Sequence, residues 1–169
     1  MDAIKLRPWQ MEDAVPLSLM ANNKKIWDNV RDRLPNPYTI EDAKAWIAST
    51  KKEKPTLNFC IEYDGWVAGS AGILLQEDIY RKTAEVGYFI AEPYWGKGIA
   101  TKALQLLIAY IQNNFDLVRI YATTFAHNEA SNKVLRKNKF YLESVRRKAT
   151  IKNNILLDDM VWVKWLDQT

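Results

Sequence analysis

The sequence contains only one cysteine, Cys60, and one histidine, His127, among its 169 residues. A single thiol cannot form a disulfide within the chain, and its isolation fits a reducing compartment. One cysteine and one histidine are also too few for the clusters that hold structural zinc, so we expect no metal site. No stretch approaches the roughly 18 apolar residues that span a membrane. These scarcities argue against disulfide-stapled, zinc-binding and membrane-spanning proteins.

The ends and the overall charge of the chain bound its class further. Residues 1–5 lack the basic region and the following apolar stretch of a signal peptide, so we expect a cytoplasmic protein. With 48% hydrophobic and 26% charged residues, the composition is ordinary for one globular domain, which we expect to span residues 1–169. The net charge of +4 suits an anionic partner, but the basic residues are scattered, which argues against direct nucleic-acid binding.

Hydrophobic periodicity predicts strands that alternate with helices. Strands are expected over residues 4–8, 58–63, 66–73, 83–90, 117–125, 140–146 and 156–165. Helices are expected from residue 11 to about residue 30, from an N-cap at residue 39 onward, over residues 98–115 and over residues 129–138. The Asp64-Gly65 pair between two strands is a strong hairpin signal. This order predicts a three-layer α/β domain with a mixed sheet.

A glycine-rich turn follows the strand predicted over residues 83–90. The segment from Trp95 to Thr101 reads W-G-K-G-I-A-T and opens a helix. Its two glycines permit a tight turn and leave no side chain between the backbone N–H groups and a ligand. The free N–H groups and the dipole at a helix N-terminus suit a phosphate or pyrophosphate. A plain strand-to-helix turn remains the alternative, because the segment matches neither the Walker nor the dinucleotide-binding glycine pattern.

The sequence W-G-K-G-I-A after P-Y resembles the acyl-CoA pyrophosphate loop of GNAT-type N-acetyltransferases, and is most similar to the RimJ/RimL-like branch. Trp95 stands where the wider superfamily has Gln or Arg. The resemblance implies a GNAT-like α/β/α fold whose mixed, mostly antiparallel sheet contains a splayed central strand pair. It also implies a set of residues that bind acetyl-CoA: Tyr88, Phe89, Ile90, Trp95, Gly96, Lys97, Gly98, Ile99, Ala100 and Thr101.

A second motif begins at Asn128 and reads N-E-A-S-N-K-V-L. Asn128 is a natural N-cap, and Ser131 in the first helical turn can have a merely local role. The motif also resembles the second cofactor motif of the same family. That resemblance implies that Asn128 contacts the pantetheine arm, and that Ser131 lies near the thioester and protonates the leaving thiolate. Lys139 stands where the branch usually has glycine, so the turn after this helix is expected to differ, because lysine tolerates a positive φ poorly.

The reaction of such an enzyme needs a base, because only a neutral amine attacks a carbonyl. Glu85, on the strand before the glycine turn, is the first candidate, with an ordinary exposed strand glutamate as the alternative. Asp158 and Asp159 come next. D-x-x-x-W from Asp158 resembles a late motif of the family near the acceptor, although a hairpin-end charge pair is equally natural. His127 is expected to be an exposed loop residue.

The acceptor site is the least defined part of this interpretation. The loop with Arg31, Arg33 and Tyr38 resembles a segment that helps to form the acceptor site in the same branch, with a solvated loop as the alternative. The acceptor is a primary amine, either a protein N-terminal α-amine or a small molecule, and the charge of +4 favours an acidic or neutral one. A homodimer is compatible with the sequence, which does not determine the oligomeric state.

The sequence thus predicts an acetyl-CoA-dependent N-acetyltransferase that transfers the acetyl group directly within a ternary complex. Two other classes stay open. An acyl-CoA-binding module without turnover would keep the glycine turn and lack the base. A small RNA- or ribosome-binding domain would show steeply salt-dependent RNA binding.

Overall fold

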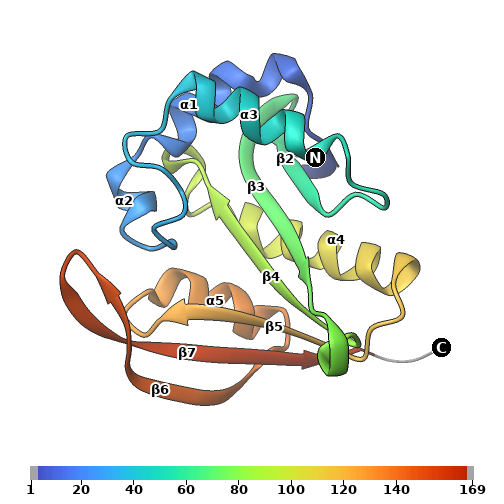
Figure 1. The fold of residues 1–169 in the computed structure, drawn as a ribbon, viewed down its shortest axis with the longest axis vertical. Helices are drawn as coiled ribbons and strands as arrows, with labels where there is room; N and C mark the ends of the chain where they lie inside the picture. Colours follow the sequence, from blue (N-terminus) through green and yellow to red (C-terminus); the bar gives the residue numbers. More distant parts are fainter. Residues whose placement is uncertain (1–3, 167–169) are drawn as a thin grey trace. The chain divides into compact units, whose positions relative to one another are not determined.

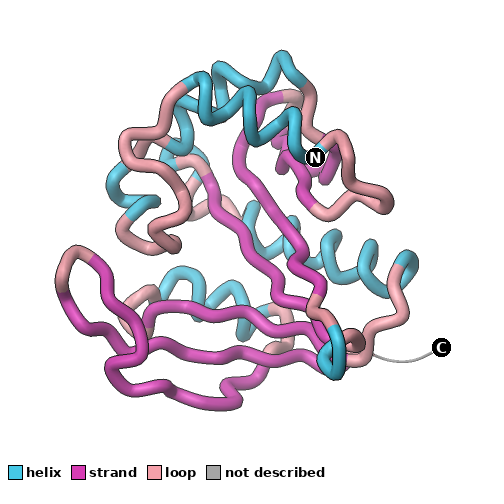
Figure 2. The backbone as a smooth tube through the Cα atoms, in the orientation of Figure 1, coloured by secondary structure: helices cyan, strands magenta, loops and turns pink. Residues whose placement is uncertain are grey.

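The computed structural model describes residues 4–166, so residues 1–3 of the segment read for a signal peptide lie outside it. The strands form a mixed seven-stranded sheet in the order β1-β2-β3-β4-β5-β7-β6. Strands and helices are interspersed along the chain (Figure 1, Figure 2), and the predicted α/β class is confirmed. Across residues 4–166, the helices are all too short or too polar to cross a membrane.

The chain forms two compact units. The first comprises residues up to 72 and residues 88–106, and the second comprises residues 73–87 and residues from 107 onward. Strands β3 (Trp66–Leu75) and β4 (Thr83–Ile90) and helix α4 (Ile99–Asn114) each contribute residues to both units. We therefore describe the contacts of each unit separately.

In the first unit, β1 (Ile4–Pro8) pairs antiparallel with β2 (Asn58–Tyr63), and β2 pairs antiparallel with β3. The predicted hairpin between β2 and β3 is confirmed, and both residues of its turn have a positive φ, 49° at Asp64 and 85° at Gly65. The remaining elements of this unit are helical: η1 (Met11–Asp13), α1 (Ala14–Ala21), α2 (Lys24–Trp27), α3 (Ile40–Thr50) and η3 (Glu92–Tyr94).

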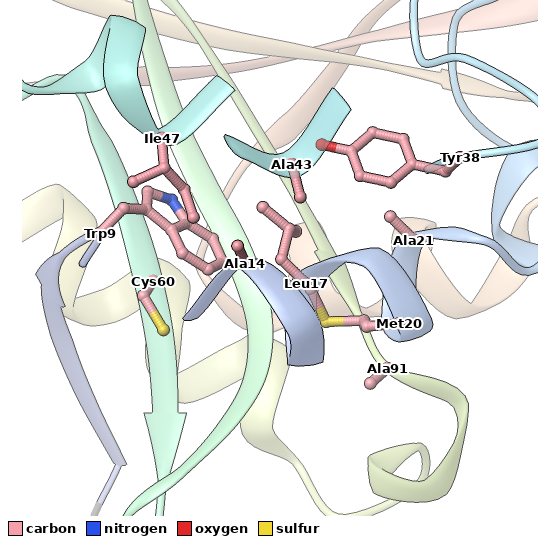
Figure 3. Packing of buried hydrophobic residues seen from close by; sticks show 10 residues of the cluster. All are labelled: Trp9, Ala14, Leu17, Met20, Ala21, Tyr38, Ala43, Ile47, Cys60 and Ala91. Atoms are coloured by element: carbon pink, nitrogen blue, oxygen red, sulfur yellow. The ribbon is translucent and has the colours of Figure 1, made fainter. Parts of the chain in front are cut away.

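The core of this unit forms where α1 and α3 pack beside β2 (Figure 3). Ala43, Ile47 and Cys60 are completely buried there. The other members of the cluster are Trp9, Ala14, Leu17, Met20, Ala21, Tyr38 and Ala91. The alternative of a solvated loop therefore does not hold at Tyr38, because this side chain is only 6% exposed.

The single helix predicted from residue 11 to about residue 30 is also wrong, because the chain breaks at Asn22 and Asn23. The side-chain oxygen of Asn23 accepts hydrogen bonds from the N–H groups of Lys25 and Ile26 and so starts a new helix. The side-chain oxygen of Asn22 accepts a hydrogen bond from the Tyr38 N–H at 3.1 Å. Asparagine competes in this way with the helical backbone for hydrogen bonds. Leu19, near the end of α1, is 74% exposed.

Helix α3 begins as predicted. Thr39 is its N-cap, and it forms a reciprocal capping box with Asp42. Ala43 and Ile47 lie on its buried face, whereas Trp46 is 37% exposed.

Strands β3 and β4 approach each other closely at Gly69. A Cβ atom at this position would lie 2.4 Å from the carbonyl oxygen of Phe89. Real Cβ atoms do not tolerate such a contact with backbone, so only glycine fits here without a shift of one strand.

The second unit contains η2 (Asp78–Tyr80), β5 (Arg119–Phe125), α5 (Glu129–Lys137), β6 (Tyr141–Lys152) and β7 (Ile155–Trp165). Strand β5 pairs antiparallel with β7, and β7 pairs antiparallel with β6. The parallel pairing of β4 with β5 covers only three positions, from Thr83–Arg119 to Glu85–Tyr121. Both strands continue beyond that point, which agrees with the splayed central pair implied by the resemblance.

The side chains of β5 alternate strictly between two faces. Ile120, Ala122 and Thr124 are buried, whereas Tyr121 and Thr123 are only partly buried. The hydroxyl of Thr124 donates a hydrogen bond of 2.6 Å to Asn132 of α5, so α5 covers the buried face. Partly buried polar side chains are therefore left on the opposite face of this part of the sheet.

Candidate functional site

The glycine turn in the first unit has the backbone geometry that its sequence predicts. Gly96 and Gly98 have φ values of 75° and 76°, in the left-handed region that favours glycine. The carbonyl of Gly98 accepts the N–H of Lys102 at 3.1 Å, so α4 starts directly after the second glycine. A Cβ atom built on either glycine would meet nothing within 4 Å. The space above the turn is therefore open, and the backbone at the start of α4 borders it.

Two side chains of the turn have defined contacts. The indole N–H of Trp95 donates a hydrogen bond of 2.7 Å to the carbonyl of Ile90, which ties the turn to the end of β4. The ammonium of Lys97 lies 5.7 Å from the ring centre of Tyr63 and 5.5 Å from that of Tyr94. These cation–π contacts keep a positive charge beside the turn.

A further contact supports the turn from α2. Glu92, just before the turn, accepts a hydrogen bond of 2.7 Å from the side chain of Asn23 and an ion-paired hydrogen bond from Lys25. Both bonds lower the pKa of Glu92, and the bond from Lys25 has the larger effect. The break between α1 and α2, which sequence reasoning missed, thus provides the residues that hold η3.

The second motif lies at the start of α5 in the second unit. The side-chain oxygen of Asn128 accepts a hydrogen bond of 3.3 Å from the Ser131 N–H, as expected of an N-cap. Asn132, which is fully buried, donates to the Ala126 carbonyl at 3.3 Å, and its oxygen accepts from Thr124. The start of α5 is thereby fixed to the end of β5, and Ser131 stays partly exposed.

The turn after α5 keeps its left-handed geometry despite the lysine. Lys139 has a φ of 63°. The N–H of Lys139 bonds the Arg136 carbonyl at 2.9 Å, and the N–H of Phe140 bonds the Leu135 carbonyl at 3.1 Å. This pattern is a Schellman motif. The turn therefore does not differ as we predicted, because two hydrogen bonds and the burial of Leu135 and Phe140 offset the strain at Lys139.

Glu85 lies on β4 where the pairing with β5 ends. It is partly buried, and one of its carboxylate oxygens accepts a hydrogen bond of 3.2 Å from the Thr123 hydroxyl. The carboxylate thus lies on the face of β5 opposite α5. A carboxylate held this way can take a proton from an amine directly or through water.

The two neighbouring aspartates differ sharply. Asp158 accepts hydrogen bonds of 2.8 Å from the Lys148 N–H and from Arg147. Both bonds lower the pKa of Asp158, and the bond from the Lys148 N–H has the larger effect. Asp159 is 3% exposed and is held by a two-pronged ion pair with Arg146, whose Nε lies 2.9 Å from Oδ1.

Other polar groups near this face are also paired. Arg119 donates a hydrogen bond of 2.6 Å to Glu143, and its guanidinium lies 5.3 Å from the ring centre of Tyr121. His127 is exposed, as predicted, and its ring stacks on that of Phe125. Within residues 4–166, no group of three or more His, Cys, Asp or Glu side chains could hold a metal ion.

A sequence model described as "Acetyltransferase (GNAT) domain" matches residues 3–141. The chain belongs to the GNAT acetyltransferase family. The membership of the GNAT family that the glycine turn indicated is thus confirmed, and so is the prediction of an N-acetyltransferase.

Relatives among characterised and named proteins agree. Probable N-acetyltransferase YjcK of Bacillus subtilis is 28% identical over 165 residues, covering 94% of this chain and 91% of that protein. Uncharacterized N-acetyltransferase YoaA of the same organism is 31% identical, covering 76% of this chain and 75% of YoaA. The ribosomal-protein-serine acetyltransferase of Escherichia coli is 34% identical over 87 residues, covering 52% of this chain and 49% of that enzyme.

Solved structures share the fold. RimL, a ribosomal L7/L12 alpha-N-protein acetyltransferase solved with coenzyme A, matches with a TM-score of 0.85 at 23% identity, over 97% of this chain and 94% of that one. The microcin C7 self-immunity acetyltransferase MccE, solved with acetyl-CoA and AMP, matches with a TM-score of 0.80 at 27% identity, over 98% and 94%. This GNAT chain therefore has the fold of acetyltransferases along nearly its whole length.

Proposed function

We propose that this GNAT chain transfers the acetyl group of acetyl-CoA to the α-amine of a protein or peptide, as a single cytoplasmic domain over residues 1–169. The glycine turn supports the cofactor, because two left-handed glycines, one residue apart, leave open space above the helix start. The ribosomal-protein relatives support a peptide acceptor. An α-amine is also the easier acceptor, because its pKa of about 7.7 to 8.0 leaves much of it neutral near pH 7.

The cofactor roles follow the two motifs. The N–H groups of Gly96 to Thr101 bind the pyrophosphate, and the charge of Lys97 supports it. Tyr88, Phe89 and Ile90 line the thioester arm, and a backbone N–H of this segment stabilises the oxyanion. Asn128 contacts the pantetheine.

The catalytic roles are assigned by charge and position. Glu85 takes the proton of the attacking amine, since its carboxylate is held by the Thr123 hydroxyl on a partly buried face. Ser131 protonates the leaving thiolate. Asp158 is the second candidate base, because hydrogen bonds from the Lys148 N–H and from Arg147 lower its pKa and so weaken it as a base. The amine attacks the thioester directly, and orientation of the two reactants supplies much of the rate.

Calorimetric titration of acetyl-CoA into the wild type and into Gly98→Ala tests the cofactor turn. The added methyl meets no protein atom, so it projects into the space proposed for the phosphates. Gly65→Ala is the matched control, because Gly65 has a φ of 85° and equally open surroundings in the hairpin turn.

We expect one-site binding that is weakened at least about tenfold by Gly98→Ala and unchanged by Gly65→Ala. A wild type that binds no acetyl-CoA would refute the proposal. Acetylation of a panel of peptides and small amines, followed by release of free CoA, then tests the acceptor. Transfer to small amines alone would refute the peptide acceptor.

A further inference from the structure

One face of the second unit carries four polar side chains: Glu85, Thr123, Asp159 and Arg146. Thr123 and Phe125 are two positions apart on β5 and therefore point to the same side of the sheet. Phe125 pairs with Asp159 of β7, and Asp159 pairs with Arg146 of β6. Because directly paired residues share a face, Arg146 lies on the same side as Glu85, which contacts Thr123.

The guanidinium of Arg146 is both fixed and accessible. Its Nε and one amino group are held by the buried carboxylate of Asp159. Its other amino group has no partner within the part of the chain that the structure describes, and the side chain is 52% exposed. The hydrogen bonds to Asp159 raise the pKa of Arg146. Burial acts against this increase, whereas the charges of Asp159 and Glu85 add to it. Arg146 is thus a permanently charged, preorganised donor near Glu85.

The strand β6 is shaped to present this residue. The register jumps from Arg146–Asp159 to Thr150–Leu157, so three residues of β6 bulge out opposite Asp158. The side chain of Asp158 closes the bulge through its bonds to Arg147 and Lys148. Bulges re-aim side chains, and this one follows Arg146 directly.

We infer that Arg146 is a specificity-determining residue that binds an acidic side chain on the second residue of the peptide acceptor. This inference rests on the proposed function. The α-amine would meet Glu85 while the carboxylate meets the open amino group of Arg146. The open amino group of Arg146 therefore selects peptides with an acidic second residue over neutral ones.

The two groups are anchored close together on this face. Thr123 and Asp159, which hold Glu85 and Arg146, are diagonal neighbours on the adjacent strands β5 and β7. Such neighbours are roughly 7–8 Å apart. Consecutive Cα atoms of a peptide are about 3.8 Å apart, so an α-amine and the side chain of the next residue have a comparable spacing.

The test compares two peptides that differ only in aspartate or asparagine at the second residue, each acetylated with saturating acetyl-CoA. We expect the wild type to favour the aspartate peptide by about tenfold to hundredfold in kcat/KM, as for loss of one charge-assisted hydrogen bond. Arg146→Gln should remove this preference, mainly through KM, and keep turnover of the asparagine peptide. The matched control Arg147→Gln removes the same charge one residue away, from a side chain that is 80% exposed, and should keep the preference.

Removing Arg146 alone leaves Asp159 buried without its partner, which can impair folding. The double variant R146Q/D159N avoids this, because both members become neutral and can still hydrogen-bond each other. It should fold and show no preference. Equal kcat/KM of the wild type for the two peptides, or a preference that survives in the double variant, would overturn the role of Arg146 and leave the proposed function intact. No turnover of either peptide would overturn the peptide acceptor itself.

Discussion

Glu85 is the residue whose role can be separated most directly from binding. Replacing it with glutamine keeps the size of the side chain and the capacity to accept from Thr123, but removes the base. We expect Glu85→Gln to lower kcat by about 10²-fold or more, as for loss of a general base, with an unchanged Kd for acetyl-CoA.

The measurement is kcat against pH for the wild type and the variant, with calorimetry for the Kd. If the two enzymes turn over equally at every pH, Glu85 has no part in the reaction and Asp158 becomes the candidate to examine.

Lys139 is a residue where the sequence and the local geometry disagree. A non-glycine residue in the left-handed region costs roughly 1 kcal/mol, and here it occupies the C′ position of a Schellman motif. We therefore expect Lys139→Gly to raise the free energy of unfolding by up to about 1 kcal/mol. Urea unfolding measures this. Lys137→Gly, in the last turn of α5, is the contrasting variant and should lower stability by about as much. A loss of stability in Lys139→Gly would show that the lysine side chain contributes more than its backbone costs.

At the scale of elements, β3 and β4 approach each other closely at Gly69. Gly69→Ala would place a methyl 2.4 Å from the Phe89 carbonyl, so one strand must shift. We expect this change to cost about 1–3 kcal/mol of stability, as for overpacking in a core. Gly87→Ala, in β4 itself, meets nothing within 4 Å and serves as the control, with little change expected.

Urea denaturation of both variants gives the comparison. Because Phe89 belongs to the segment proposed to line the thioester arm, acetyl-CoA affinity should fall with Gly69→Ala and not with Gly87→Ala. Equal stability of the two variants would mean that β3 and β4 part without cost.

Asp13, at the start of α1, makes the stability of the folded chain depend on pH. Burial alone would raise the pKa of Asp13, but hydrogen bonds from Arg7, at 2.7 and 2.9 Å, and from the Gln10 N–H outweigh it and lower the pKa. The ionised form is therefore favoured by folding. Its contribution is fully present above the ordinary aspartate value of 3.8 and is lost as the pH falls through the lower folded value.

We expect the free energy of unfolding to decline below about pH 4, and Asp13→Asn to reduce this decline while lowering stability at pH 7. Urea unfolding at a series of pH values measures both effects. A decline of the same size in the variant would assign the effect to carboxylates other than Asp13.

For the whole molecule, alternation and periodicity predicted most of the fold. The bounds of β1, β2 and β4 agree with the predicted strands residue for residue, because each has a clear apolar pattern between turn signals. The break at Asn22 escaped prediction because its partner, the Tyr38 N–H, lies 16 residues away. A local pattern carries no information about such a contact.

The candidate site was predictable only in part, for the same reason. The glycine turn and the N-cap at Asn128 are local motifs, and each has its expected geometry. Arg146 was missed, because its environment depends on the pairing of β5, β7 and β6 and on the bulge beside Asp158. In the sequence it is one of 24 basic residues with no motif around it.

The buried thiol has a practical consequence. Cys60 is completely buried in the first unit, and burial raises its pKa to about 12, so almost none of it is thiolate at neutral pH. Maleimide and iodoacetamide reagents should therefore leave the folded wild type unlabelled. A cysteine introduced at an exposed position, for instance in place of Arg147, would be the single reactive site. A chain with this one substitution can thus carry a single fluorescent or spin label beside the bulge, where it would report acceptor binding without any change to Cys60.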